Sequence, residues 1–208
     1  MDKEYWKRIY QKQNEETLPS LFARSVTERL DVAGKRIIEL GCGNGRDAIH
    51  FANHDAIVTA IDQCDNMIET LQYRFQRVET LQFECCDFTM LADGEPYDLV
   101  FSRFTLHSIS EEQETNVLNW TIRNLKPGGH LCIEARGQKN EIYRIGQPVK
   151  DEPDAFILDG HYRRFINFNS FCKKLEHIGF NIEYAAEQKG FAPFNGDDET
   201  YMRIVASK

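Results

Sequence analysis

The sequence predicts an α/β fold in which a parallel β-sheet carries helices on both faces. Short apolar stretches alternate with segments of helical periodicity from residue 35 to residue 135, which is typical of strands joined by crossover helices. Two further apolar stretches near the C-terminus can pair as a hairpin at the sheet edge. A chain of 208 residues is long enough to bury a full core, so residues 1–208 are expected to form one domain.

The N-terminal part is predicted to form two helices, over residues 3–16 and 20–30. The second places Phe22, Val26 and Leu30 at helical spacing. Strands and helices then alternate. The predicted strands are 35–40, 56–61, 81–85, 97–102 and 129–135, and the helices between them are 45–53, 65–78 and 111–125.

The pattern changes after the fifth strand. Residues 136–165 show no clear periodicity and contain several Gly and Pro residues, so a long irregular loop is expected, of the kind that is usually functional or disordered. A helix at 168–178 and strands at 180–187 and 200–206 complete the chain. The last two strands are the expected hairpin.

Composition excludes several functional classes. The formal net charge of −8 disfavours a general nucleic-acid or anionic-membrane binder. The first residues contain no apolar core of a signal peptide, and no later stretch approaches 18 uninterrupted apolar residues. The six cysteines show no C-x-x-C pairing, which indicates reduced thiols and no metal site. We therefore expect a cytoplasmic protein, monomeric or homodimeric, without nucleic-acid or membrane partners.

A glycine-rich turn joins the first strand of the alternating pattern to the next helix. Residues 39–45 read ELGCGNG. Such a turn lets a ligand approach bare backbone beside free N–H groups. The G-x-G-x-G spacing differs from the G-x-G-x-x-G of dinucleotide oxidoreductases.

Three further segments follow this turn in order, and the ordered set resembles class I S-adenosylmethionine-dependent methyltransferases of the small-molecule type. They are the strand end Ala60-Ile61-Asp62, the strand end Cys86-Asp87-Phe88, and the strand 97–102 (YDLVFS) with the later segment 125–129 (LKPGG). The resemblance implies a Rossmann-like, doubly wound, mostly parallel seven-stranded sheet with a C-terminal antiparallel hairpin. It also implies S-adenosyl-L-methionine as the cofactor and S-adenosyl-L-homocysteine as its product.

The resemblance also implies a set of cofactor-binding residues. Asp62 is expected to accept hydrogen bonds from the ribose hydroxyls, Asp87 from the adenine amino group, and Glu39 to face the cationic end of the cofactor. The whole set is Tyr10, Glu39, Gly41, Cys42, Gly43, Asn44, Gly45, Arg46, Asp62, Gln63, Met67, Asp87, Phe88 and Ser102.

Structural roles remain open for several of these residues. Asp62 could cap the next helix, and Asp87 could be a simple turn acid. Glu39 could pair with a neighbouring cation, while Met67 could fill the core. Arg46 could bind the cofactor carboxylate, or it could pair with Asp47 or Glu39.

The fourth strand ends in Ser102-Arg103-Phe104-Thr105, in place of the Asn/Asp-Pro-Pro-Tyr/Phe motif of enzymes that methylate nucleobase or glutamine amino groups. This difference favours a small acceptor. Arg103 lies where the resemblance places the transferable methyl, and His107 could act as a base near neutral pH. These two are the candidate catalytic residues. The alternatives are an internal ion pair for Arg103 and plain helix packing for His107.

Cationic side chains gather in the segment after the fifth strand, and arginine suits bidentate binding of phosphate or carboxylate. The alternative is an ordinary solvated surface. Trp6 and Tyr10 could belong to an N-terminal lid or to a packed helix. The candidate substrate-binding residues are Trp6, Arg103, Arg136, Tyr162, Arg163 and Arg164.

The sequence thus favours methyl transfer to an O or N atom of a small, anionic metabolite. The alternatives are a protein or RNA acceptor, or a non-catalytic S-adenosylmethionine-binding regulatory protein. Within the domain we expect N-terminal helices or a lid (1–30), a cofactor-binding core (35–135), a substrate-side insertion (136–167), and a helix with the terminal hairpin (168–208).

Overall fold

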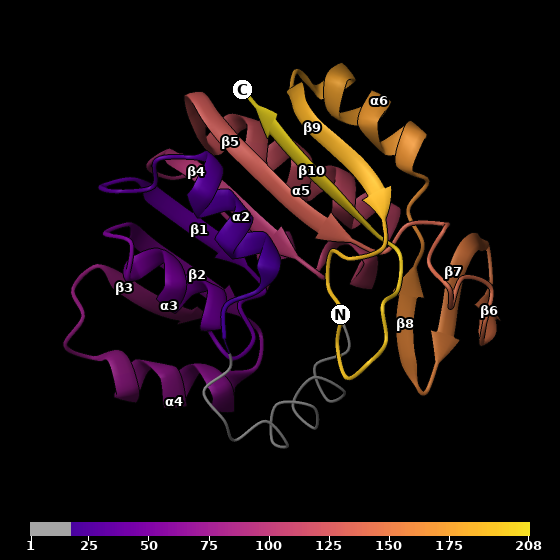
Figure 1. Cartoon of the computed structure of the whole chain (residues 1–208), viewed down its shortest axis with the longest axis horizontal. Coiled ribbons are helices and arrows are strands. Elements are labelled where there is room, and N and C mark those ends of the chain that lie inside the picture. Colours follow the sequence, from indigo (N-terminus) through magenta and orange to yellow (C-terminus); the bar gives the residue numbers. More distant parts are fainter. Residues whose placement is uncertain (1–17) are drawn as a thin grey trace.

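The computed structural model describes residues 18–208, and its centre is a seven-stranded sheet (Figure 1). The first five strands along the chain pair in parallel with one another. The C-terminal hairpin joins this sheet through antiparallel pairing of the last strand with the fifth strand and with its own hairpin partner. This arrangement confirms the predicted fold class. In spatial order the strands are β3 (Leu81–Cys85), β2 (Ile57–Asp62), β1 (Arg36–Leu40), β4 (Tyr97–Arg103), β5 (Leu125–Ala135), β10 (Tyr201–Ser207) and β9 (Asn181–Gln188).

Helices cover both faces of the sheet (Figure 1). One layer packs on an aromatic cluster in which Phe101 of β4 lies 5.1 Å from both Phe22 and Phe51, measured between ring centroids. The other packs on aliphatic side chains of β4, β5 and β10. The first layer contains α2 (Leu21–Arg29), α3 (Arg46–Ala52) and α4 (Asp65–Phe75), and the second α5 (Glu111–Asn124) and α6 (Phe168–Ile178).

Local capping explains where the helices of the second layer begin and end. Ser110 and Gln113 form a reciprocal capping box at the start of α5. The Asn167 side chain accepts a hydrogen bond from the Ser170 N–H at the start of α6, and Gly179 ends that helix at φ 113°. Two 3-10 turns, η1 (Phe88–Met90) and η2 (Leu106–Ser108), follow β3 and β4.

The expectation of an irregular loop over residues 136–165 is wrong. The segment folds into a three-stranded antiparallel sheet of β6 (Gln147–Val149), β7 (Glu152–Leu158) and β8 (His161–Arg164). Its two ends meet where Gly137 bridges to Ile166. The ring of Phe156 on β7 packs together with the rings of Tyr143 and Phe165.

One local signal in this segment could have predicted the hairpin. Asp159 and Gly160 are the two loop residues between β7 and β8, with φ of 54° and 74°. Asp-Gly is a favoured pair for a two-residue hairpin turn, because both positions require positive φ. Apolar and polar residues hardly alternate in the flanking strands β7 and β8. Which of their side chains are buried depends on packing against the rest of the protein.

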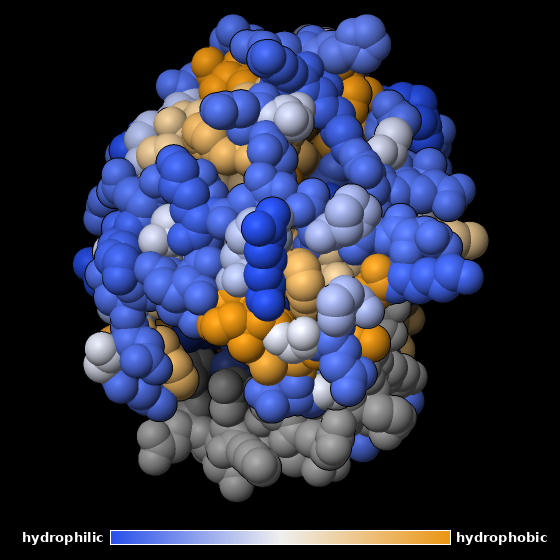
Figure 2. Space-filling view, turned by 90° about the vertical axis from the view of Figure 1, so that its right-hand side faces the viewer, coloured by the Kyte–Doolittle hydropathy of each residue, from blue (hydrophilic) through white to orange (hydrophobic). Residues whose placement is uncertain are grey.

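The side of the molecule that carries β6–β8 and α6 is mostly hydrophilic, with apolar side chains gathered in small areas (Figure 2). Ile145 and Ile157 of the insertion are 49% and 40% exposed. No helix among the described residues is long and apolar enough to cross a membrane. The predicted helix 3–16, with Trp6 and Tyr10, lies outside the described residues.

Candidate cofactor and substrate site

The glycine-rich turn lies at the carboxyl end of β1 and is held in place by β2. The N–H groups of Gly41 and Cys42 donate to the Ile61 carbonyl oxygen at 2.8 and 2.9 Å. The Gly43 N–H donates to Oδ2 of Asp62 at 3.0 Å. Ligands of open α/β sheets bind at this edge, where neighbouring connections leave the sheet in opposite directions.

Asp62 makes two backbone contacts at this edge of the sheet. Besides Gly43, it accepts a hydrogen bond from the Cys64 N–H at 2.9 Å, directly before α4. It thus anchors both the turn and the helix start. Each carboxylate oxygen has a second acceptor position, so these contacts are compatible with ligand hydroxyls.

Packing requires glycine at two positions of the turn. Gly41 has φ 73°, and a Cβ atom there would lie 2.4 Å from Cγ2 of Thr105. Thr105 is itself fixed, because its hydroxyl lies 2.5 Å from the hydroxyl of buried Ser102. At Gly45, φ is 75° and a Cβ would lie 2.8 Å from the Phe83 ring. The turn therefore packs closely against protein on its inner side.

Glu39 contributes a buried carboxyl beneath the turn. It is 3% exposed, and within the described part of the chain its Oε2 has no hydrogen-bond partner. Burial, reinforced by the neighbouring carboxylate of Asp47, raises its pKa well above the usual value. A buried acceptor without a partner is costly, which makes Glu39 a candidate for a cationic or N–H-bearing ligand.

Arg46 begins α3 directly after the turn. Its side chain is 29% exposed, and its Nε lies 3.9 Å from Asp47, so the pairing with Asp47 is loose. Burial and the nearby Arg103 lower its pKa. Arg46, at the start of α3, and Arg103, at the end of β4, thus both belong to this edge of the sheet.

The remaining cofactor candidates occupy mixed environments. Asp87 is exposed and caps η1, since its Oδ1 accepts hydrogen bonds from the N–H and hydroxyl of Thr89 at 2.9 and 2.8 Å. Phe88 is 3% exposed in the core. Met67, in the first turn of α4, is partly buried and packs against the core. Cys42 is buried. Gln63 is half-buried, and its Nε2 has no hydrogen-bond partner among the described residues. The Asn44 side chain accepts a hydrogen bond from the Arg46 N–H at 3.4 Å.

Arg103 forms the internal ion pair that the sequence left open as an alternative. Its Nε lies 2.7 Å from Oε1 of Glu134 on β5. The other oxygen of Glu134 lies 2.5 Å from Nε of Arg203 on β10. The sequence analysis did not identify Glu134 or Arg203 as site residues. The partners of a charged residue inside a strand are known only once the pairing of the strands is known.

His107 is buried on η2, with 3% exposure. Its Nδ1 accepts a hydrogen bond from the Arg136 N–H at 3.3 Å, so the ring proton resides on Nε2. Burial and then the charge of Arg136 hold its pKa well below 6.5, with His161, Arg163 and Arg164 adding to the effect. An Nδ1 that already accepts a hydrogen bond is poorly placed to take a proton, so this geometry favours a neutral donor over a general base.

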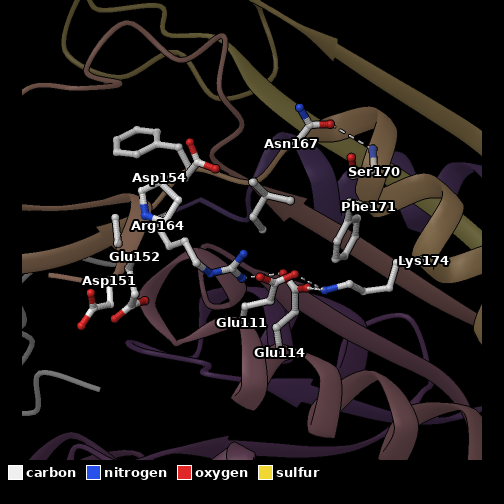
Figure 3. A pocket seen from close by; sticks show the side chains of 14 residues that line it. Glu111, Glu114, Asp151, Glu152, Asp154, Arg164, Asn167, Ser170, Phe171 and Lys174 are labelled. Atoms are coloured by element: carbon white, nitrogen blue, oxygen red, sulfur yellow. Dashed lines mark hydrogen bonds and ion pairs between the residues drawn. The ribbon is translucent and has the colours of Figure 1, made fainter. Parts of the chain in front are cut away.

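The cationic cluster of the insertion separates into different environments. Arg164 donates to Glu114 of α5 at 2.5 Å and to the carbonyl oxygens of Ile109 and Leu106. Lys174 of α6 reaches the same Glu114 at 2.7 Å (Figure 3). Arg164 therefore fastens β8 to α5, and its guanidinium is committed to protein partners.

The other candidates of the cluster point elsewhere. The Tyr162 hydroxyl donates to Glu152 at 2.6 Å, and Arg163 Nη1 donates to the Leu158 carbonyl oxygen at 2.8 Å. Arg136 forms a close ion pair with Glu199 and packs over the Tyr201 ring. Since alternate strand residues face opposite sides, Arg163 shares a side of β8 with His161, away from Tyr162 and Arg164.

A cavity of about 300 Å³ lies on the side of β8 that carries Arg164 (Figure 3). Most of its charged residues are acidic, and its wall includes no residue of the glycine turn. The charged residues that line it are Glu111, Glu114, Asp151, Glu152, Asp154, Arg164 and Lys174.

Comparison with known proteins finds a family match over the part of the chain that contains the glycine turn. Residues 37–129 match the family model described as a methyltransferase domain. This segment runs from β1 to the start of β5, and so contains the glycine turn, Asp62 and the ends of β3 and β4. The match confirms the resemblance stated from the sequence motifs.

Two curated relatives align with about half of this chain. Phosphoethanolamine N-methyltransferase 1 of Triticum aestivum is 30% identical over 105 residues, which are 49% of this chain and 21% of that protein. Ubiquinone biosynthesis O-methyltransferase of Coxiella burnetii is 24% identical over 124 residues, 58% of this chain and 52% of that protein. The aligned part of this chain thus spans about half or less of these relatives.

The fold itself has solved counterparts. A crystal structure of an S-adenosylmethionine-dependent methyltransferase from Methanosarcina mazei superposes with a TM-score of 0.75, covering 88% of this chain and 96% of that one at 18% identity. At this identity the likeness establishes the common fold.

Proposed function

We propose that this protein transfers a methyl group from S-adenosylmethionine to an O or N atom of a small molecule. The observation that carries the proposal is the glycine turn of residues 41–45, fixed against β2 by Asp62 inside the segment that matches a methyltransferase domain. The two curated relatives are named as an N- and an O-methyltransferase of small acceptors.

The described residues fit the cofactor. Glu39 supplies a buried acceptor without a partner in the described structure, which suits the amino group of the methionine portion. Asp62 supplies acceptor positions for ribose hydroxyls, and Asp87 supplies an exposed carboxylate near the end of β3. When bound, the cofactor supplies an electrophilic sulfonium methyl group. The protein contributes orientation of the reactants and exclusion of water.

We further propose that the acceptor is anionic. The side chains of Arg46 and Arg103 at the carboxyl edge are 29% and 16% exposed, and the Arg136 N–H donates to Nδ1 of His107. The protein as a whole carries a net charge of −8, and partly exposed guanidinium groups at the edge where ligands of such sheets bind support an anionic acceptor. A neutral His107 with its proton on Nε2 can donate a hydrogen bond to an acceptor oxygen.

Calorimetric titration with S-adenosylmethionine and S-adenosylhomocysteine tests the cofactor. We expect micromolar binding that Asp62→Ala abolishes. Asp93→Ala is the matched control, because Asp93 pairs with exposed Arg123 away from the turn. Melting temperatures of all three proteins separate lost binding from lost folding. Absence of binding by the wild type would remove the proposal.

A second experiment distinguishes an enzyme from a silent binding protein. Turnover is measured with radiolabelled S-adenosylmethionine against phosphorylated, carboxylated and neutral small acceptors, and against protein and RNA fractions. Labelling of phosphorylated or carboxylated acceptors supports the proposal. Labelling confined to protein or RNA supports a macromolecular acceptor, and binding without any turnover supports a regulatory protein.

A further inference from the structure

Three charged side chains on adjacent strands stand in one cross-strand row. The sheet register pairs Arg103 of β4 with Glu134 of β5, and Glu134 with Arg203 of β10. Each oxygen of the single carboxylate contacts one guanidinium, at 2.7 Å to Arg103 and 2.5 Å to Arg203. The row crosses the sheet at the carboxyl end of β4.

Protein encloses the end of the row that carries Arg203. Glu134 is fully buried, and the Arg203 side chain is 9% exposed. Rings of Phe22 and Phe191 lie 5.0 and 4.4 Å from the guanidinium carbon of Arg203. Arg203 also donates to the Phe191 carbonyl oxygen. Protein thus surrounds this guanidinium, and a ligand cannot reach it.

The other end is more open. The Arg103 side chain is 16% exposed, and its guanidinium lies 4.1 Å from the centre of the Phe104 ring. A guanidinium has five N–H donors, and Glu134 engages the one on Nε. The Glu134 carboxylate therefore holds the guanidinium plane of Arg103 from the buried side. The Arg103 end of the row faces the edge of the sheet where ligands of such folds bind.

The charges of the row do not cancel. Two guanidinium groups share one carboxylate, so the row retains one positive charge. Arg46 lies close enough for Arg103 to lower its pKa, while Glu39 and Asp47 oppose this charge from the turn and from α3. A fixed, partly exposed arginine in such a setting suits an oxyanion, which it can bind through two parallel hydrogen bonds.

We propose that Glu134 and Arg203 are positioning residues that fix Arg103 as the receptor for a carboxylate or phosphate group of the ligand. This inference rests on the proposed function and names a chemical group that the same site recognises. The oxyanion has two sources: the methionine carboxylate of the cofactor, or an anionic acceptor.

The test measures binding by calorimetry for the wild type, Arg103→Met, Glu134→Gln and Arg203→Lys. Arg123→Met is the matched control, because it removes an ion-paired arginine from the exposed surface. The ligands are S-adenosylhomocysteine, 5′-methylthioadenosine, which lacks the amino-acid portion, and inorganic phosphate in the presence of S-adenosylhomocysteine. Melting temperatures verify that each variant is folded.

For Arg103→Met we expect about a tenfold or greater loss of affinity for the oxyanion-bearing ligand, as for a hydrogen bond to a charged group. If the preference for S-adenosylhomocysteine over 5′-methylthioadenosine falls, the cofactor carboxylate is the oxyanion. If that preference is retained and phosphate binding weakens, the oxyanion belongs to the acceptor. If neither changes, or if Arg123→Met has the same effect, the proposal is overturned.

Glu134→Gln separates positioning from simple charge balance. Removal of a negative charge makes the site more positive, which by itself would strengthen anion binding. A positioning role predicts the opposite, a several-fold weakening, because Arg103 loses its anchor. Stronger binding would refute this role. Arg203→Lys keeps the positive charge but loses the planar fork geometry of the guanidinium group. It replaces Glu134→Gln in the test of the positioning role if Glu134→Gln does not fold. Failure of the wild type to bind either nucleoside would instead refute the proposed function itself.

Discussion

The backbone N–H of Arg136 donates a hydrogen bond to Nδ1 of His107, at 3.3 Å. Arg136 directly follows β5, and His107 lies on η2, so this bond joins the connections that leave two neighbouring strands. It fixes the tautomer of the buried ring, with the proton on Nε2. The side chain that the sequence identified as a possible base is therefore held as a hydrogen-bond donor.

We predict that His107 stays neutral in the folded protein at pH values just below 6.5, where an exposed histidine takes up a proton. Burial and then the neighbouring Arg136 lower its pKa well below 6.5. In the unfolded chain the same ring takes up a proton near pH 6.5, so this residue reduces stability as pH falls below that value, down to its folded pKa. ¹⁵N NMR of the histidine rings measures both the charge and the tautomer. A His107 signal that titrates near 6.5 would contradict the prediction.

Arg164→Met should lower the free energy of unfolding by about 3 kcal/mol, because it leaves a buried carboxylate and two carbonyl oxygens without their donor. Lys174 still neutralises part of Glu114, which keeps the loss at the lower end of such values. Arg163→Met, one position earlier on the opposite side of β8, should cost about 1 kcal/mol. Urea unfolding measures both, and equal losses would show that Arg164 is not the fastening residue.

Gly41→Ala should cost about 3 kcal/mol or more, since it combines left-handed backbone strain with a Cβ placed 2.4 Å from Thr105. Gly34→Ala is the matched control: its φ is 68°, with no atom within 4 Å of the new Cβ, so strain alone costs about 1 kcal/mol. Adding Thr105→Ser to Gly41→Ala removes the clashing methyl and should restore part of the loss. A double-mutant cycle from urea unfolding measures this coupling, and an absence of coupling would disprove the packing account.

Glu141→Gln should destabilise the protein at neutral pH and lose this effect in acid. Burial raises the pKa of Glu141, but hydrogen bonds from the Thr200 N–H and from Lys189 outweigh it and lower the value to about 2. A depressed carboxyl pKa contributes stability above the unfolded value near 4.5, and this contribution disappears as pH falls towards 2. Unfolding of the wild type and variant between pH 7 and pH 2.5 measures the difference, with exposed Glu79→Gln as control. A constant difference would contradict the assignment.

Local sequence patterns predicted the sheet and its helices because those elements follow from periodicity and capping. The helix at 168–178 was expected at the residues where α6 is observed, between its cap Asn167 and Gly179. The glycine turn was equally clear, since it joins a buried strand to a helix. The strands of the insertion were missed because they show little apolar alternation, and only Asp159-Gly160 marked the hairpin locally.

Patterns among neighbouring residues are enough to predict the fold class, the glycine turn and the acids at the strand ends. Tertiary structure alone decided what each cation does. Arg164 meets Glu114 across 50 positions and Arg203 meets Glu134 across 69, so no local pattern distinguishes an arginine committed to an ion pair from one that faces a ligand. The physical reason is that buried charges require partners, and the strand order decides which partners they meet.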